Sequence, residues 1–464
     1  MRDYRILIKP FEYVALLDIK IYKCINEHAA ATVLMRIKEE KMETYMNLLM
    51  EEQKITIEAE NNQQEHKIIL FGVVVDFSFN LQYSDTILKM EIVSTTFYMD
   101  IKTHFRTFQE PQMSSAQISK LLVKDYVGGC IYQQNKQKNK ITRLLIQYEE
   151  TDWEFAKRVA SLENSFIVPF FSKNNVGYYI GFPTGTVRIL EKDIRICFNL
   201  DNGKYLIKKS SGIDGISEAN EIELEVESRE IYDIGDVIKY NSKDYFIYKI
   251  ESRYEGGECL HTYFLKTEIG LKTVCKYNMA IRGCSFEATV IEVEKDKVKI
   301  ELLNDENDEM MVKKWFLYAT IYSSPDGSGW YYMPEIGDNV RLYVPENEED
   351  AFVVSAIHKE TDNSRQNPDY KSLKTKYGKE ILFTPETLIM TNNKGMTIEL
   401  SDKEGISIIS NKDIIIQSDE NITIGSQDES ILIAAQDKLQ MKQGETGMTL
   451  SEDISFIGGE FRMQ

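Results

Sequence analysis

Short runs in which apolar and polar residues alternate, the pattern of half-buried β-strands, extend over most of the chain. They are frequent in residues 1–110, for example in ILFGVVVDFSFNLQY, and again in residues 166–275, for example in YFIYKIESRY. Five further runs lie within residues 281–359, a length that suits a five-stranded barrel. The sequence therefore predicts a mainly β protein, in which two regions of barrel or sandwich size precede a smaller barrel.

Helical periodicity is confined to three segments. Residues 114–126 and 151–163 each begin with Ser or Thr three residues before Gln or Glu, which is the capping-box pattern of helix N-termini. Both segments continue with an apolar stripe at helical spacing. Residues 30–50 indicate a third helix, and residues 360–376 are polar without any period and are predicted to form a linker.

The C-terminal tail, residues 377–464, carries from about residue 395 onward an imperfect repeat of about eight residues. Each unit has two or three polar or turn residues and then a short strand with an apolar pair at positions i and i+2. Four consecutive pairs are spaced by eight, and the spacing later slips to nine and six. The pairs are Ile398/Leu400, Ile406/Ile408, Ile414/Ile416, Ile422/Ile424, Ile431/Ile433, Leu439/Met441, Met448/Leu450 and Ile454/Phe456.

The spacing of each pair places both side chains on the same face of a strand. A repeat of eight residues is too short to bury that face by itself, so it must stack on its neighbours or on copies from other chains. It suits one side of a three-sided prism whose other two sides come from identical chains. The tail is therefore predicted to form an intertwined triple-stranded β-helix in a homotrimer, at least about 40 Å long, with the apolar pairs in its core.

Two simpler interpretations of the tail compete with this prediction. The first is an ordinary β-rich tail whose alternation is coincidental, which eight successive units argue against. The second is a Ca²⁺-binding β-roll, which needs a Gly-Gly-x-Gly-x-Asp nonapeptide that no unit contains.

Charge excludes several classes of partner. The chain of 464 residues has 55 Lys+Arg against 74 Asp+Glu, a formal net charge of -19. A nucleic-acid-binding protein needs a basic face for phosphates, and docking on an anionic bilayer needs basic residues as well. The N-terminal residues have no apolar signal-peptide region, and no stretch approaches about 20 apolar residues. We therefore expect synthesis in the cytoplasm without a signal peptide.

Candidate chemistry is sparse. The six cysteines form no close pair of the kind that zinc sites use. The histidines His28, His66, His104, His261 and His358 are isolated and are predicted to be structural. The presence of acidic residues at Asp152 and Glu154 is explained by a helix N-terminus, which favours negative charge. Trp153 and Trp330 are predicted to pack rather than to bind ligand. Residues 326–329 are predicted to be a turn. We predict no catalytic residues, no cofactor and no metal site.

Three motifs resemble those of one family, the VgrG or phage late control protein D family. The stretch YEETDWEFAKR resembles its Tyr-x-Glu-Ser/Thr-Asp-x-Glu-Phe-x-x-Arg signature, and residues 329–340 resemble the Gly-Trp…Pro-x-x-Gly-Asp-x-Val block of its spike OB-fold. The repeat tail resembles the needle that follows that block, and Phe71-Gly72-Val73 is a weaker match to a hub strand. The matching signature residues are Tyr148, Glu150, Thr151, Asp152, Phe155, Arg158, Gly329, Trp330, Pro334, Gly337 and Asp338.

The resemblance implies a tail-hub-like region at 1–275, with barrels at about 1–110 and 166–275 joined by 111–165. An OB-fold at 281–359, a linker at 360–376 and a β-helix spike at 377–464 would follow. It implies a homotrimeric hub that caps a hexameric inner tube among baseplate proteins, and a needle that pierces the target membrane when an outer sheath contracts. It also implies assembly into a phage tail, tailocin, extracellular injector or type VI-like particle, delivered to the target cell envelope.

The family pattern has variants that this chain does not match. The linker is too short for the lysozyme domain that some spikes carry, and no His lies beyond His358 to hold iron at the tip. A PAAR-type tip protein or an effector is expected to dock on Gly458, Gly459, Phe461 and Met463. Two rival functions remain: a trimeric tail-fibre or adhesin that binds glycans, which predicts exposed aromatic residues along the needle, and an enzyme hidden in the hub.

Overall fold

The computed structural model divides the chain into two compact units, Met1–Lys359 and Glu360–Gln464, which we describe separately. The predicted mainly β fold class is confirmed, since strands dominate both units. The structure describes residues 4–51, 54–61, 63–82, 85–110, 112–133, 140–190, 195–255, 258–307, 312–358 and 367–459.

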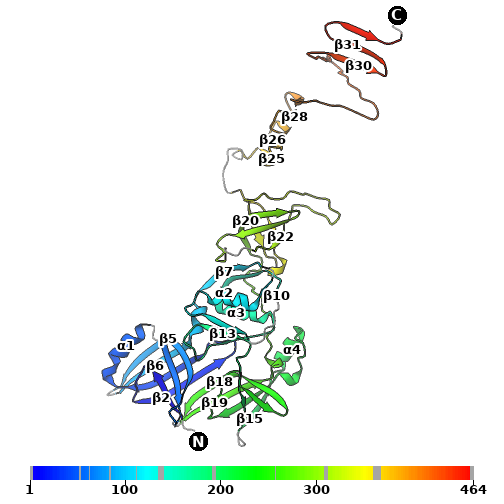
Figure 1. Ribbon diagram of the computed structural model, residues 1–464. Coiled ribbons are helices and arrows are strands. Elements are labelled where there is room, and N and C mark those ends of the chain that lie inside the picture. Colours follow the sequence, from blue (N-terminus) through cyan, green and yellow to red (C-terminus); the bar gives the residue numbers. More distant parts are fainter. Residues whose placement is uncertain are drawn as a thin grey trace. The chain divides into compact units, whose positions relative to one another are not determined.

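One twelve-stranded sheet forms the base of the N-terminal unit (Figure 1). Ten strands follow one another in hydrogen-bonded order, and two short strands are attached beside β18. In that order the strands are β1 (Arg5–Lys9), β4 (Lys54–Glu60), β5 (His66–Gln82), β6 (Asp85–Ser94), β3 (Ala30–Ile37), β2 (Ala15–Cys24), β18 (Lys243–Glu255), β19 (Glu258–Lys266), β16 (Ile222–Ser228) and β15 (Ile196–Leu200), with β17 (Val237–Tyr240) and β14 (Val187–Arg188) attached.

Each half of this sheet has its own core. Buried side chains of residues 6–92 form the first core, to which Ile231 and Cys259 are added from the second half. Residues 166–271 form the second core. The halves are joined by antiparallel pairing of β2 with β18, for example Ile21 opposite Ser252. This pairing links residues more than 200 positions apart, so no local pattern in the sequence indicates it.

The predicted helix at 30–50 is wrong in its first part. Residues 30–37 form strand β3, in which Ala31, Val33, Met35 and Ile37 are buried and the residues between them are not. This period of two is the strand pattern, and it outweighs the helix propensity of Ala, Leu and Met. Helix α1 (Met42–Met50) occupies only the second part.

Helix α4 (Asn202–Ser210) was not predicted, because residues 166–275 were assigned to strands throughout. Asp201 caps this helix by accepting a hydrogen bond from the backbone N–H of Lys204, and Lys208 and Lys209 lie in its last turn. Both features are sequence signals of a helix. The short 3-10 helices are η1 (Glu39–Lys41), η2 (Thr95–Asp100), η3 (Glu218–Asn220), η4 (Ile269–Leu271) and η5 (Glu348–Asp350).

The segment between the two halves contains the two predicted capped helices. Helix α2 (Ser115–Val123) begins after Ser114 and helix α3 (Asp152–Ser161) begins after Thr151, and both capping boxes are present. The helices pack on a shared core with three small sheets. These sheets pair β7 (Thr103–Phe108) with β11 (Leu145–Thr151), β8 (Met113–Ser114) with β10 (Lys140–Ile141), and β13 (Gly177–Ile180) with both β12 (Ile167–Pro169) and β9 (Cys130–Gln133).

A five-stranded barrel follows. A bridge between Tyr318 and Val353 closes the barrel, and its core also takes in Leu144, which precedes β11, and Ile146 of β11. The barrel is therefore packed directly on the connecting segment. In sheet order its strands are β22 (Trp315–Leu317), β21 (Lys297–Leu302), β20 (Ser285–Glu294), β23 (Asn339–Tyr343) and β24 (Phe352–Val354).

The C-terminal unit consists of two antiparallel meanders with residues 411–438 between them, where no strand is formed. Among the described helices of the whole chain, none has the length and apolar character that a membrane-spanning segment requires. The first meander comprises β25 (Lys371–Lys374), β26 (Glu380–Phe383), β27 (Thr387–Thr391), β28 (Met396–Ser401) and β29 (Gly405–Ser410), and the second comprises β30 (Leu439–Gln443), β31 (Thr446–Leu450) and β32 (Ile454–Ile457).

Two unusual titratable groups are buried near the line where the halves of the large sheet join. Lys23 is 3% exposed on β2 and lies 5.4 Å from the centre of the Phe171 ring. Burial lowers the pKa of Lys23 to about 8; nearby Asp233 opposes this shift and Lys67 adds to it. His261 on β19 shares a hydrogen bond of 2.6 Å with Ser252, and its Nε2 has no partner among the described residues.

We predict that Lys23→Met stabilises the protein at neutral pH. The pKa of Lys23 is near 10.5 in the unfolded chain and about 8 when folded, so the charged ammonium is disfavoured in the native state. The cost is fully present below pH 8, about 3 kcal/mol, and disappears as the pH rises to 10.5. Urea unfolding at pH 7 and pH 10.5 measures this difference. A variant no more stable than wild type at pH 7 would show that Lys23 is not destabilising.

We predict an acid-induced loss of stability through His261. Burial, aided by Lys23 and Lys67, lowers the pKa of His261 to about 4 from an ordinary 6.5. The native state therefore favours neutral imidazole, and this stability is complete above pH 6.5 and is lost, by about 3 kcal/mol, as the pH falls to 4. Comparing the unfolding midpoints of wild type and His261→Gln between pH 7 and 4 isolates this contribution. Parallel curves for the two proteins would contradict it.

Candidate functional site

The first meander of the C-terminal unit presents an apolar face. Residues directly opposite each other in antiparallel strands point to the same side of a sheet. The register pairs Leu388 with Leu400, Met390 with Ile398 and Ile398 with Ile408. Continued across all five strands, the face consists of Leu373, Ile381, Phe383, Leu388, Met390, Ile398, Leu400, Ile406 and Ile408.

This face has no second layer in one chain. None of the four buried cores contains a residue beyond Val353, and no residue in the described range 367–459 is buried. A stable domain normally buries the apolar face of a sheet against another layer, because that burial supplies most of the favourable free energy. The apolar face is therefore one layer of a core whose second layer is not supplied by the described residues of the same chain.

Residues 411–438 also expose apolar side chains, and they do so without forming a sheet. No backbone N–H or C=O group of residues 412–438, all of which the structure describes, bonds to another backbone group. The six predicted core isoleucines of this stretch are 50–71% exposed, namely Ile414, Ile416, Ile422, Ile424, Ile431 and Ile433. Unpaired strand backbone with apolar side chains is an open template for pairing with other chains.

A second periodic signal marks the turns of this stretch. The hydroxyl oxygens of Ser410, Ser418 and Ser426 each accept a hydrogen bond from a backbone N–H two or three residues later. These serines are spaced by eight, as the isoleucine pairs are, and each forms a local turn of the type that Ser favours. The repeat thus has a turn-forming serine and an apolar pair at fixed positions in these units.

The second meander repeats the arrangement of the first. Leu439 lies opposite Leu450, and Met448 lies opposite both Met441 and Phe456. All six predicted core residues of this sheet share one face. The repeat predicts that these strands stack on their neighbours or on other chains. Within one chain, the first five strands form one antiparallel meander and the last three form a separate one. The intertwined arrangement itself stays a prediction.

The predicted tip-docking residues are only partly placed. Gly458 and Gly459 follow β32 and are exposed. Phe461 and Met463 lie outside the described residues.

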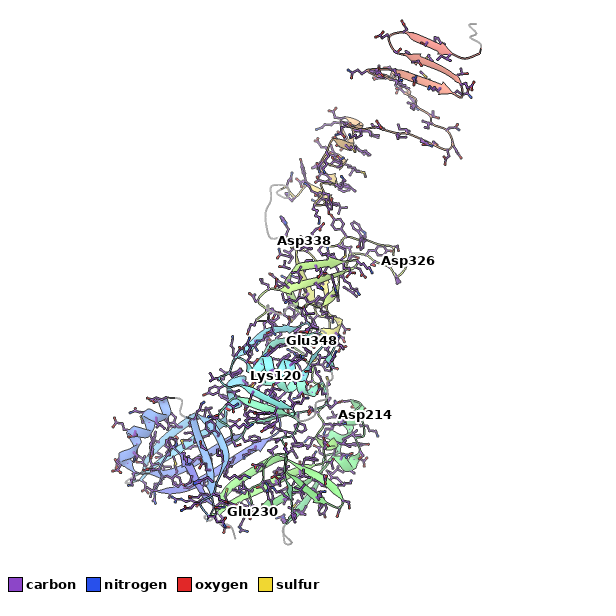
Figure 2. All side chains as sticks on the ribbon, in the orientation of Figure 1. Lys120, Asp214, Glu230, Asp326, Asp338 and Glu348 are labelled. Carbon is purple, nitrogen blue, oxygen red and sulfur yellow. The ribbon has the colours of Figure 1, made fainter. Side chains whose placement is uncertain are left out.

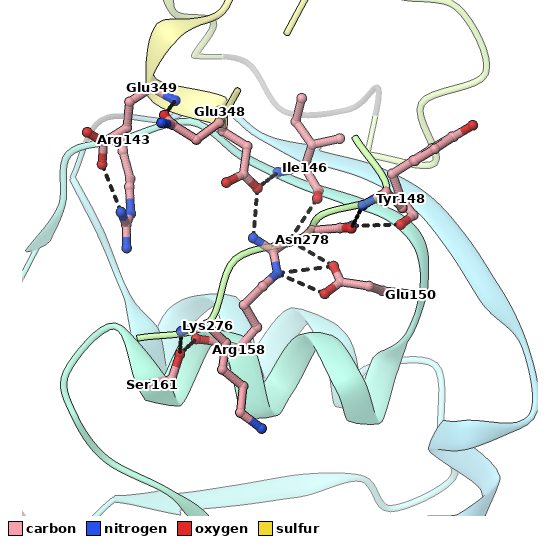
Figure 3. Close-up of polar contacts among 12 residues, drawn as sticks. Arg143, Ile146, Tyr148, Glu150, Arg158, Ser161, Lys276, Asn278, Glu348 and Glu349 are labelled. Carbon is pink, nitrogen blue, oxygen red and sulfur yellow. Dashed lines mark hydrogen bonds and ion pairs between the residues drawn. The ribbon is translucent and has the colours of Figure 1, made fainter. Parts of the chain in front are cut away.

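Signature residues of β11 and α3 have a structural role: they join the OB-fold to the rest of the N-terminal unit (Figure 3). Arg158 of α3 is 3% exposed and donates from Nη1 to Glu348 at 2.7 Å, and from Nη2 to the carbonyl of Ile146 at 2.7 Å and to Glu150 at 2.8 Å. Glu348, on η5 of the OB-fold, also accepts the Ile146 N–H at 3.1 Å. Burial alone lowers the pKa of Arg158, but Glu348 and Glu150 outweigh it, so that pKa is raised and the guanidinium stays charged.

Asp152 lies at the centre of a second buried network. Its carboxylate therefore has a role beyond its place at the N-terminus of helix α3. Its carboxylate accepts hydrogen bonds from Arg106 at 2.6 Å, from Tyr126 at 2.8 Å and from Gln147 at 2.9 Å, and it is 1% exposed. Arg106 and His104 in turn contact Glu306 of the OB-fold, at 3.4 and 2.7 Å. Glu150 and Asp152 are thus both held in structural ion pairs.

The remaining signature side chains of this region pack. The Tyr148 ring meets Phe286 of the OB-fold edge-on, with centroids 5.1 Å apart. Phe155 is fully buried and stacks on Phe108 at 5.1 Å. Trp153 is also buried, as predicted.

The block that resembles the OB-fold motif builds a hairpin arm and a turn. Gly329 has a φ of +133°, and a Cβ there would lie 2.4 Å from the carbonyl oxygen of Tyr322, so only glycine fits. The Trp330 N–H bonds to that same carbonyl at 2.8 Å. The predicted turn at 326–329 is confirmed by its hydrogen bonds, and Figure 2 shows Asp326 on it. Trp330, predicted to pack, is instead 48% exposed.

The turn at 334–338 leads into β23. Pro334 is buried, Gly337 has a φ of +94°, and Asp338 accepts the N–H of Glu335 at 2.8 Å. Gly337 and Asp338 also exchange backbone hydrogen bonds with Val290 of β20. These positions therefore fix the entry of a barrel strand.

No metal centre is evident in the described part of the chain, where no group of three or more His, Cys, Asp or Glu side chains could hold an ion. Four of the five histidines contact side chains of neighbouring segments, namely His28, His66, His104 and His261. The predicted structural role of these four histidines agrees with these contacts.

Comparison with known proteins gives likeness in structure only. No family model and no curated protein matches the sequence. A chain of the lidded Francisella PdpA-VgrG complex is similar at 10% identity and a TM-score of 0.58, covering 89% of this chain and 80% of that one. The Escherichia coli c3393 protein, described as a type VI secretion component with structural similarity to the T4 tail proteins gp27 and gp5, is similar at 11% identity and a TM-score of 0.52, covering 76% of this chain and 100% of that one. The signature motifs and these structures agree, and the chain has the VgrG-like spike fold.

Proposed function

We propose that this protein is the non-enzymatic, homotrimeric central spike and baseplate hub of a contractile injection system. In this role the N-terminal unit joins the inner tube, and the C-terminal unit forms a needle that pierces the target membrane. The type of system, whether phage tail, tailocin, extracellular injector or type VI-like apparatus, is left open by this proposal.

The uncovered apolar face of the C-terminal unit carries the proposal. Nine side chains of the first meander, six isoleucines of residues 411–438 and six side chains of the second meander have no partner layer in one chain. Three copies around an axis would supply that layer, and each isoleucine fully buried there contributes about 1.5–3 kcal/mol. Pairing between chains would also satisfy the free backbone groups and leave no long edge.

The N-terminal unit suits the hub role. Each chain contributes two β halves with separate cores, so three chains would present six β lobes around an axis. A ring of six similar lobes matches the symmetry of a hexameric inner tube, which we propose as the partner on that side. Other baseplate proteins would surround it, and a PAAR-type tip protein or an effector would dock at residues 458–464.

A mechanical role fits the use of the polar residues. The acids that sequence motifs single out, Glu150 and Asp152, are held in ion pairs with Arg158 and Arg106. The same two arginines also pair with Glu348 and Glu306 of the OB-fold and so tie it to the hub. A spike pushed by a contracting sheath needs a joint that transmits force. The bidentate pair with Glu150 fixes the Arg158 guanidinium that contacts Glu348 across the joint. Membrane contact would be transient, and nucleic acid is not expected as a partner.

Co-expression with the inner-tube protein of the same gene cluster tests the hub role. We expect the two to co-purify at three copies of this chain to six of the tube protein. A trimer that fails to bind the tube would favour the tail-fibre or adhesin alternative. That alternative also predicts many exposed aromatic side chains along the needle, whereas the described part of residues 377–464 has three, Tyr377, Phe383 and Phe456, and from residue 395 onward only Phe456.

A further inference from the structure

An open groove lies within the OB-fold, between the barrel and the hairpin arm that carries Gly329. Its volume is about 1030 Å³, which is enough for several linked small rings. One wall is the arm, at residues 320–323 and 327–331, and the other is the end of β22 and the segment 349–352. The groove is formed by one chain and does not depend on the proposed trimer.

Aromatic rings dominate the arm side of the groove. Tyr322, Trp330 and Tyr331 line it and are 53, 48 and 74% exposed. Their positions are fixed by the backbone bond between Trp330 and Tyr322 and by a 2.9 Å hydrogen bond from the Tyr331 hydroxyl to the Lys295 carbonyl. Exposed aromatic rings that are fixed in place in this way are unusual on a free surface, because leaving large rings in water is unfavourable. Their burial by a ligand would be strongly favourable.

The polar groups of the groove are acidic or neutral. Asp296, Glu349 and Asp350 line it together with serine and threonine side chains, and no Lys, Arg or His is among the described residues that do. Phosphate-bearing and other anionic ligands need cations at their binding site. The charge pattern therefore excludes nucleic acids and favours a ligand with many hydroxyl donors.

We propose that this groove binds a neutral oligosaccharide. The C–H groups on the face of a sugar ring carry slight positive charge and pack on the negative face of an aromatic ring, for which Trp330 and Tyr331 are placed. Sugar hydroxyls donate to carboxylates, and hydrogen bonds to charged acceptors are stronger than neutral ones. Asp350 on the opposite wall, and Asp296, would accept such bonds, so the spike would hold a glycan chain while it acts.

Calorimetric titration of the full-length protein with chitotetraose and with cellotetraose, both neutral, tests this proposal. At least one should bind with a stoichiometry of one per chain and shift the tryptophan emission. Trp330→Ala should weaken binding about tenfold, a loss of about 1.4 kcal/mol, while Trp330→Phe should retain most of the affinity. Phe198→Ala, which removes an equally exposed aromatic ring on β15, is the matched control and should bind as wild type does.

Three results would overturn the proposal. The first is absence of binding heat with both tetrasaccharides. The second is binding that Trp330→Ala and Tyr331→Ala leave unchanged, which would place the sugar elsewhere. The third is a groove that binds tetralysine but no sugar, which would make it a site for basic peptides.

Discussion

The Ile416→Asp variant is expected to fail to assemble, and to be monomeric or aggregated where the wild type is a stable trimer. In the proposed needle, three copies of Ile416 meet at the axis, so the substitution would bring three carboxylates together in an apolar core. Burying even one unpaired carboxylate is prohibitively costly, and each would also repel the other two. Size-exclusion chromatography with light scattering, and electrophoresis in SDS without heating, report the loss of the trimer.

The adjacent residue offers a matched control. Ile415 is 82% exposed and lies between Ile414 and Ile416, so in a strand its side chain points to the opposite face. Ile415→Asp makes the same chemical change one position away and should leave the trimer intact. Equal effects of the two substitutions would show that the stretch is not an alternating strand, and an SDS-resistant Ile416→Asp trimer would refute the needle arrangement.

The Arg158→Met variant is expected to lose about 3–5 kcal/mol of unfolding free energy, because it leaves the buried carboxylates of Glu150 and Glu348 without a counter-charge. Those groups connect α3 and β11 to η5 of the OB-fold. The joint should therefore loosen before the barrels unfold. Urea unfolding followed by circular dichroism, together with limited proteolysis near residues 275–285, measures both effects.

Arg143→Met provides the comparison for that variant. Arg143 also pairs with an OB-fold carboxylate, Glu349, at 2.8 Å, but the Glu349 side chain is more than half exposed. Exposed pairs of this kind contribute at most about 1 kcal/mol, so this variant should unfold almost as wild type does. If the two variants lost equal stability, the difference in burial between the pairs would not matter, and the interpretation of Arg158 as the buried joint to the OB-fold would be wrong.

Local features of this fold are predictable from sequence. The two capping boxes at Ser114 and Thr151 each specify a helix start within four residues, because the cap and its partner are neighbours in the chain. The octad repeat likewise encodes turn and strand at fixed spacing. The error at residues 30–37 arose where the strand period of two competed with helix-forming residue types, and tertiary burial decided for the strand.

Long-range features are not predictable in this way. The pairing of Arg158 with Glu348 joins residues 190 positions apart, and nothing near Glu348 marks it among the neighbouring Glu349 and Asp350. The apolar face of the first meander begins at Leu373, well before the first pair that the repeat reveals, since the register of four hairpins is needed to place it. A single sequence does not specify which chain covers that face.

The native mass of the purified full-length protein tests the central claim most directly. Light scattering should give about 161 kDa, three times the chain mass of 53.8 kDa, and this value should persist on dilution to nanomolar concentration. A species of about 54 kDa that stays folded and soluble would contradict the account, since the apolar face of residues 373–456 would then be stable without any partner.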